Sequence, residues 1–313
     1  MSPVFAGDAH PVPIHTSAVP MSPTLPTARD YLMLLLLGMV WGGNFLLIKI
    51  GVATIPPTTF AVLRLAIAGI VMAGLARFLR EPFTFPIRAW GPILLASISG
   101  NALPFILIGW GQQRIDAGIA AICMGVMPLA TILLAHVFTF DEKLNPRKLI
   151  GVLFGFAGLV VLIGPKTLMG LGHQALAELA VCLGAFCYGI NALATKALRG
   201  YPLSALAAVT FGVSALIDLP LALLWDRPWA LSPSWQSLWA IFILAALPTG
   251  LGTLQMFDII KRLGVSFFSQ INFIVPVFGV LWGALLLGET PPVNALLALG
   301  CILAGIAVTR RRV

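Results

Sequence analysis

Ten long apolar stretches follow one another along this chain, and they constrain its fold more than any other feature. A helix needs about 20 mostly apolar residues to cross a bilayer, and each stretch is close to that length. Only 10% of the residues are charged, whereas a soluble domain carries about 25%. We therefore expect an all-α integral membrane protein with ten transmembrane helices. The ten stretches are residues 31–51, 58–78, 89–110, 117–138, 147–164, 175–197, 203–225, 236–257, 265–287 and 293–309.

The lysines and arginines between these stretches predict which side of the membrane each loop faces. If the amino terminus is cytoplasmic, 14 of the 19 basic residues lie on the cytoplasmic side, four lie outside, and Arg64 lies within a span. Basic loops favour the cytoplasm, so we expect both termini there, in a cell membrane of the bacterial inner-membrane type. The net charge of +8 is then a topology signal, and no basic and aromatic patch suggests nucleic-acid binding. Residues 1–30 are rich in proline and predict a disordered cytoplasmic tail.

An internal repeat divides the chain into two halves, residues 31–165 and 175–310. Its members lie 147 positions apart: Gly42 and Gly189, Asn44 and Asn191, Lys49 and Lys196, Glu142 and Glu289, Gly158 and Gly305. Each half holds five predicted spans, an odd number, so the second half would enter the membrane from the opposite side. The sequence thus predicts two inverted five-helix repeats around a central cavity, an architecture typical of secondary transporters. Duplication that merely enlarges a membrane scaffold is the alternative.

Four segments together resemble the drug/metabolite transporter superfamily and, within it, the EamA-type exporters with ten spans. The resemblance covers about residues 30–310 and implies a basket of helices that exports small metabolites or amino acids without ATP. The substrate is not fixed by it, because one fold can host many functions. Asp258 departs from the family, whose members often carry an aromatic residue there. The segments are Trp41-Gly42-Gly43-Asn44, Ala117-Gly118-Ile119-Ala120-Ala121 through Met127-Pro128, Asp141-Glu142-Lys143-Leu144, and Pro276 through Gly288-Glu289.

Two polar and aromatic pairs within the spans are candidate substrate-binding residues. Asn44 and Asn191 are repeat mates, and an amide can donate and accept hydrogen bonds. Trp41 and Tyr188 are also mates, each three residues before its asparagine and therefore on the same helical face. An aromatic ring beside an amide suits a ligand with an apolar body. Helix–helix hydrogen bonding and plain packing are the alternatives.

Three charged residues within or near the spans are further candidates. Arg64 and Asp218 lie at matching depths, about 9 and 10 Å from the outer ends of their spans, by a rise of 1.5 Å per residue. We expect them to form an ion pair, or one of them to bind a charged substrate, unless Arg64 snorkels to the interface. Asp258 precedes Arg262 by four residues, which predicts a local salt bridge, with a proton-coupling carboxylate as the alternative.

The remaining candidates are neutral. Gln255, Gln270 and Asn272 are expected to line a polar cavity, and Pro128 and Pro276 to act as mid-span kinks or hinges. A glycine pair, Gly151 and Gly155, permits close helix packing, either within one chain or in a homodimer. The four cysteines lack metal-ligand spacing, so we expect no metal site.

We therefore expect a secondary transporter of a small-molecule substrate in a lipid bilayer, without a cofactor. A membrane-embedded enzyme is the main alternative, but the sequence contains no His-Glu-x-x-His or Gly-x-Ser-x-Gly motif. It also lacks a Gly-x-x-x-x-Gly-Lys phosphate loop, so ATP is not expected to drive the protein directly. A receptor or scaffold is a third possibility, which an inverted repeat makes harder to explain.

Overall fold

The computed structural model describes residues 26–138, 145–163 and 173–309, and every regular element within them is helical. The first half contains α1 (Ala28–Gly51), α2 (Pro57–Phe78), α3 (Ile87–Ser97), η1 (Ile98–Ala102), α4 (Leu103–Gln112), α5 (Ala117–Cys123), α6 (Val126–Phe138) and α7 (Pro146–Ile163). The second contains α9 (His173–Ala197), α10 (Leu203–Leu221), η2 (Ala222–Asp226), η3 (Pro228–Ala230), α11 (Trp235–Leu244), η4 (Ala245–Leu251), α12 (Gly252–Phe268), α13 (Ile271–Leu287) and α14 (Val293–Thr309). The all-α prediction is confirmed. Residues 1–25 of the predicted tail lie outside the described residues.

The described part of the chain contains six helices, or runs of consecutive helical segments, that are long and apolar enough to cross a membrane. Three shorter apolar helices follow in the second half. Large apolar side chains cover the outer surface, and Ile70, Leu216 and Leu285 are 65–73% exposed. Water disfavours such a surface, whereas lipid does not. The long runs are Ala28–Gly51, Pro57–Phe78, Ile87–Gln112, Ala117–Phe138, Gln174–Ala197 and Leu203–Asp226.

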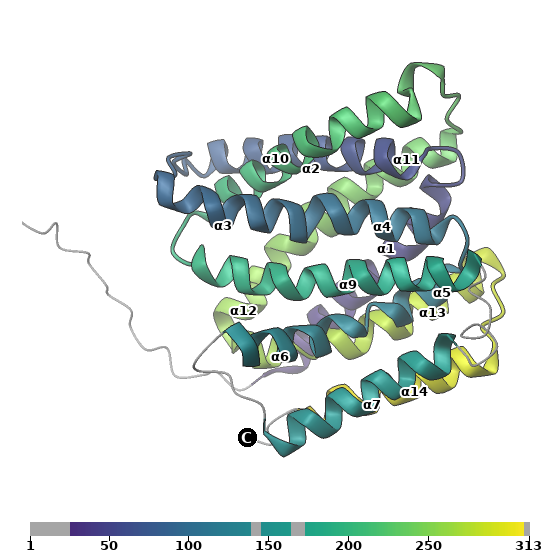
Figure 1. Cartoon of the computed structure of the whole chain (residues 1–313). Coiled ribbons are helices and arrows are strands. Elements are labelled where there is room, and N and C mark those ends of the chain that lie inside the picture. Colours follow the sequence, from purple (N-terminus) through teal and green to yellow (C-terminus); the bar gives the residue numbers. More distant parts are fainter. Residues whose placement is uncertain (1–25, 139–144, 164–172, 310–313) are drawn as a thin grey trace, which may run out of the picture.

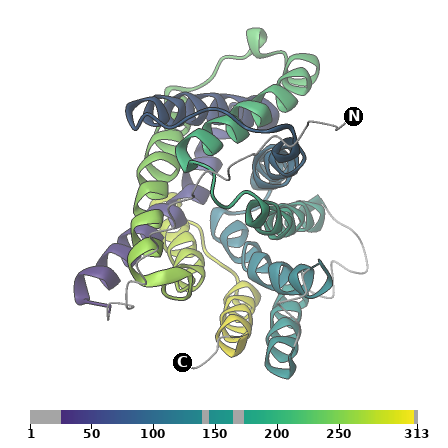
Figure 2. The same cartoon turned by 90° about the vertical axis from the view of Figure 1, so that its left-hand side faces the viewer.

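The helices run roughly along one direction and pack in pairs that join the two halves (Figure 1). The α2–α10 pair lies at one end of the bundle, and the α7–α14 pair lies at the other (Figures 1 and 2). Between them, α1 packs against α13, and α9 packs against α6. These last two contacts are equivalent under the predicted repeat, because α1 corresponds to α9 and α6 to α13.

The α2–α10 pair is tied together by reciprocal helix caps. Glu81, just beyond α2, accepts a 2.9 Å hydrogen bond from the backbone N–H of Ala205 in the first turn of α10. Asp226, at the end of η2 after α10, accepts a 2.7 Å bond from the backbone N–H of Thr59 in the first turn of α2. The first N–H groups of a helix have no intrahelical partner, and the positive end of its dipole favours a carboxylate. Each helix of the pair therefore supplies the cap for the other.

Glycines form a close seam between α7 and α14. A Cβ atom added to Gly305 would lie 2.5 Å from the carbonyl oxygen of Gly151. One added to Gly158 would lie 2.9 Å from the carbonyl oxygen of Ala298. Gly151 and Ala298 are 147 positions apart, as are Gly158 and Gly305, so the same contact is made twice. The Gly151–Gly155 segment thus packs against α14 and α6 within the chain.

Candidate functional site

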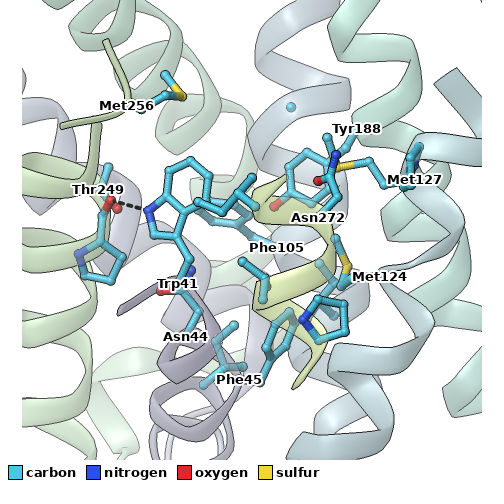
Figure 3. A pocket seen from close by; sticks show the side chains of 18 of the residues that line it. Trp41, Asn44, Phe45, Phe105, Met124, Met127, Tyr188, Thr249, Met256 and Asn272 are labelled. Carbon is cyan, nitrogen blue, oxygen red and sulfur yellow. Dashed lines mark hydrogen bonds between the residues drawn. The ribbon is translucent and has the colours of Figure 1, made fainter. Parts of the chain in front are cut away.

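A cavity of about 540 Å³ lies inside the bundle, a size typical of small-molecule pockets. Both halves contribute to its wall: α1, α2, η1, α4 and α6 from the first, and α9, α10, η4, α12 and α13 from the second. Its lining is mainly aromatic and aliphatic, with a few polar side chains among them (Figure 3). This composition suits a ligand with an apolar body and a small number of polar groups.

The cavity lies where the helices are interrupted. The π-helical segments η1 and η4 both reach its wall, through Asn101 and Pro248 respectively, which are repeat mates. The break between α5 and α6 contributes Met124 and Gly125. Their mates, Ile271 and Asn272, follow the break between α12 and α13. Such interruptions release backbone groups from the helical ladder and often occur at binding sites.

Trp41 and Tyr188, the predicted aromatic pair, both line the cavity (Figure 3). The Trp41 indole Nε1–H donates a 3.2 Å hydrogen bond to the carbonyl oxygen of Pro248 in η4. Its ring also makes an edge-to-face contact with Phe268 of α12, with centroids 5.9 Å apart. Trp41 is therefore held from two elements of the opposite half, and its orientation is fixed by them.

Of the two predicted asparagines, Asn44 lines the cavity and its repeat mate Asn191 does not. The Asn44 Oδ1 atom is buried with no hydrogen-bond partner among the described residues. The Asn191 amide instead packs on Gly100 of η1, where an added Cβ atom would lie 2.6 Å from the Asn191 Cγ. Repeat mates thus have different environments here.

Arg64 lies in the cavity wall and is 9% exposed, so it does not snorkel to the molecular surface. Its guanidinium carbon lies 4.0 Å from the centroid of the Phe105 ring, within the range of a cation–π contact. The Arg64 Nε atom is buried and has no hydrogen-bond partner in the described part of the chain. The side chain is held by an aromatic face, and its N–H groups remain available.

The expected ion pair between Arg64 and Asp218 is not formed. Asp218 is 1% exposed in α10, its Oδ2 atom has no hydrogen-bond partner among the described residues, and it does not line the cavity. Equal depth in the bundle did not bring the two side chains together. Of the pair, only Arg64 is placed to meet a ligand.

Comparison with known proteins now identifies the family. The sequence matches the EamA-like transporter family over residues 29–164 and 175–311. This chain belongs to the EamA-like transporter family. With its long apolar helices, it is a membrane protein.

Several curated relatives of this EamA protein are named as transporters. The uncharacterized transporter YoaV of Bacillus subtilis is 24% identical over 86% of this chain and 92% of its own length. An S-adenosylmethionine/S-adenosylhomocysteine transporter of Chlamydia trachomatis is 28% identical over 87% of this chain and 86% of its own. A protein of Streptantibioticus cattleyicolor named "Probable terminal-alkyne amino-acid exporter" is 24% identical over 89% and 92%. A solved crystal structure with a TM-score of 0.63 and 21% identity covers 92% of this chain and shows the same fold.

Two of the remaining predicted site residues of this EamA chain have structural partners instead of a place in the cavity wall. Gln255 donates a 2.6 Å hydrogen bond from its side-chain Nε2 to the carbonyl oxygen of Met33 in α1. Asp258 has a 49% exposed side chain and forms a 2.7 Å salt bridge with Arg262, four residues later. The local salt bridge expected for Asp258 is confirmed. Arg262 also pairs with Asp30 of α1, so the cluster joins α12 to α1.

Gln270 lies in the turn before α13 and does not line the cavity, whereas Asn272 does. Pro128 and Pro276 both line it. Pro128 is in the first turn of α6, where its missing N–H breaks no helical bond, because the break at Met124 and Gly125 precedes it. Pro276 lies inside α13. Of these two prolines, Pro276 alone lies in the interior of a helix, the position expected for a kink.

Sequence reasoning missed most of the apolar wall. Phe105, Phe211, Met256 and Phe268 line the cavity, but an apolar residue in an apolar span carries no signal of which side it faces. The sequence indicated no partner across the bundle for Glu289. Its carboxylate caps α5 from across the bundle, accepting 2.7 and 3.0 Å bonds from the backbone N–H groups of Ala117 and Gly118. Glu142, its repeat mate, lies outside the described residues.

Proposed function

We propose that this protein is a secondary transporter that exports a small organic metabolite through the 540 Å³ cavity by alternating access, without ATP. One observation carries the proposal: the cavity lies between the two halves, and repeat-related helix breaks in both halves reach its wall. An occluded site between two mobile halves is what alternating access requires. The relative from Streptantibioticus cattleyicolor, named as a probable exporter of an amino acid, supports a small organic metabolite as the substrate.

We further propose ten spans in two inverted repeats, with both termini cytoplasmic. The reciprocal caps of α2 and α10 and the doubled glycine contact of α7 and α14 support a two-fold relation between the halves. The distribution of basic residues supports the orientation. In this arrangement the α1–α2 loop and the end of α9 face opposite sides.

Cysteine labelling tests that topology. Ala53 and Ala197 are both exposed and lie near repeat-related helix ends. Ala53→Cys should react with a membrane-impermeant thiol reagent added outside intact cells, and Ala197→Cys should react only after the cells are opened. The parent protein, with native cysteines that are buried or partly buried, gives the background. Labelling of both positions from the same side would contradict the inverted repeat.

The proposed binding residues are those that meet in the cavity: Trp41, Asn44, Arg64, Tyr188 and Asn272. Trp41 and Tyr188 supply flat apolar contact area, and the two amides supply hydrogen bonds to polar groups of the ligand. Pro276 and the break before Pro128 are the proposed hinge points. The missing N–H of Pro276 weakens the helical ladder inside α13, and at Met124 and Gly125 the helix is already interrupted.

Flux through proteoliposomes tests the function. Vesicles loaded with radiolabelled amino acids, organic acids, purines or sugars should lose one of these compounds faster than protein-free vesicles, with no ATP present. Trp41→Ala should reduce this flux, whereas Trp235→Ala, on the outer surface, should leave it unchanged. The recovered compound distinguishes transport from the enzyme alternative: it is unchanged after transport and converted after catalysis. No flux for any compound, with conversion of one, would favour the enzyme.

A further inference from the structure

We infer that the transported molecule is a carboxylate with an apolar body, and that Arg64 binds its carboxylate group. The inference rests on the proposed transport through this cavity and adds the chemical class of the substrate.

Arg64 is the sole charged side chain among the described residues that line the cavity. No described aspartate or glutamate joins it there, and no described residue forms an ion pair with it. A buried cation at membrane depth is unfavourable without a partner, and intramembrane charges mark substrate pathways. An anionic ligand would supply the missing charge, whereas a cationic ligand would be repelled.

The Arg64 guanidinium retains donors for such a ligand. Its carbon lies over the Phe105 ring, 4.0 Å from the ring centroid. A cation–π contact uses the charge of the group and none of its N–H bonds, and the buried Nε atom has no partner among the described residues. A carboxylate accepts two parallel hydrogen bonds from this planar fork. One arginine matches one negative charge, whereas a phosphate near charge −2 would remain partly uncompensated.

The cavity wall beyond Arg64 suits an apolar body. Trp41, Phe105, Phe211 and Phe268 all line it, and aromatic faces supply large contact areas without hydrogen-bonding demands. Asn44 adds a buried, unpartnered Oδ1 atom that can accept one hydrogen bond from the ligand. The carboxylate can therefore belong to a plain organic acid or to an amino acid whose N–H groups approach Asn44.

Four probes that share a phenyl body and differ in charge test the inference. They are 3-phenylpropionate (anion), phenylalanine (zwitterion), 3-phenylpropionamide (neutral) and 3-phenylpropylamine (cation). Isothermal titration calorimetry on the purified full-length protein gives the dissociation constant of each. We expect 3-phenylpropionate, phenylalanine or both to bind the wild type at least about 10-fold more tightly than the neutral amide, and the amine to bind most weakly.

Substitution of Arg64 connects this preference to one side chain. Arg64→Gln should weaken the carboxylate probe about 10- to 100-fold and the neutral amide by less than about 2-fold. Arg64→Lys keeps the charge but loses the planar fork, so it should keep the preference for anions at reduced affinity. Arg114→Gln is the matched control, because Arg114 also stacks on an aromatic ring, 4.2 Å from the Trp110 centroid, but is exposed outside the cavity.

An Arg64-dependent preference for either carboxylate supports the inference, and the stronger of the two identifies an organic acid or an amino acid as the source. The inference is overturned if the amine or the amide binds most tightly, if no carboxylate binds the wild type, or if Arg64→Lys loses the anion preference. Flux of a neutral or cationic compound in proteoliposomes would leave the transport proposal standing while removing this one. Arg64-dependent carboxylate binding without flux of any compound would remove the transport proposal and leave Arg64 as the carboxylate-binding residue of the cavity.

Discussion

In the two halves of the cavity wall, the helices break at repeat-related positions, but the side chains at those positions differ. Repeat mates occupy equivalent places in the wall, but Arg64 corresponds to Phe211, and Gly125 corresponds to Asn272. The shared pairs are Trp41 and Tyr188, Arg64 and Phe211, Asn101 and Pro248, Met124 and Ile271, Gly125 and Asn272, and Pro128 and Val275. The positions of the helix breaks are therefore symmetric, whereas the side chains that line the cavity at these positions are not.

Away from the cavity the two halves agree more closely. At the α7–α14 seam, Gly158 and Gly305 are identical and make the same backbone contact in each direction. Close helix contact admits only small residues, so both copies must meet the same requirement. A ligand has no such two-fold symmetry, and the side chains that meet it are free to differ. The two halves are therefore alike where helices pack closely and different where a ligand would bind.

The largest expected effect comes from breaking the symmetric seam. Gly305→Ala places a Cβ atom 2.5 Å from the backbone oxygen of Gly151, a contact that no side-chain rotation can relieve. We expect a loss of about 1–3 kcal/mol of stability, the usual cost of overpacking, measured as a lower melting temperature by fluorescence-detected size exclusion. Gly158→Ala, at 2.9 Å from the oxygen of Ala298, should lower it by less.

Gly300→Ala is the control for this seam. Gly300 lies in the same helix, but a Cβ atom there meets nothing within 4 Å. The alanine should be neutral or slightly stabilising, because glycine is a poor helix former. Equal melting temperatures for Gly305→Ala and Gly300→Ala would mean that the seam is not closely packed in the protein.

The next effect separates two helix caps. Glu289 accepts hydrogen bonds from two N–H groups at the start of α5, whereas Glu81 accepts one at the start of α10. Glu289→Ala should cost about 1.5–3 kcal/mol, because a charged acceptor is lost and two partly buried donors lose their partner. Glu81→Ala should cost about 1 kcal/mol, typical of a lost cap. Equal shifts in melting temperature for the two variants would contradict the assignment of the stronger cap to Glu289.

The helices were predictable from the sequence, because their signal is averaged over about 20 residues. Most predicted ranges coincide with described helix to within a few residues. The ranges 117–138 and 265–287 each contain a break, at residues 124–125 and 269–270, and α12 continues to Phe268, past the predicted end at residue 257. The interruptions were less visible. Pro128 and Pro276 suggested kinks, but the π-helical segments η1 and η4 were not predicted, although Pro104 closely follows η1 and Pro248 lies within η4.

The candidate site was predictable only where polarity stood out against an apolar background. Trp41, Asn44, Arg64, Tyr188 and Asn272 were singled out in this way and do meet in the cavity. The predicted Arg64–Asp218 pair was wrong because depth along a helix does not determine the direction of a side chain. Gln255 was misplaced for the same reason, since its amide bonds to the backbone of α1.

A smaller effect should distinguish the split asparagine pair. Asn44→Ala removes a buried amide from the cavity wall and should weaken the affinity for the transported compound about 3- to 10-fold, the loss expected for one hydrogen bond. Asn191→Ala, outside the wall, should change it by less than about 2-fold. Saturation of flux by the compound that proteoliposomes identify measures both. Equal losses for the two variants would mean that the repeat mates act alike after all.

The smallest effect is expected at Asp258, which has no charged mate in the first half. Its repeat mate Gly111 is buried against Val181 and Ala177, whereas the Asp258 side chain is 49% exposed and pairs with Arg262. An exposed pair at this helical spacing contributes about 0.3–0.5 kcal/mol, and Arg262 keeps its partner Asp30 when Asp258 is changed. Asp258→Asn should therefore leave flux, and any response of flux to a proton gradient, within about 2-fold of the wild type. A variant that transports but no longer responds to the gradient, where the parent does, would instead give Asp258 a role in proton coupling. The Asp258 carboxylate, which has no charged repeat mate, would then act in the transport cycle instead of stabilising the packing of α12 on α1.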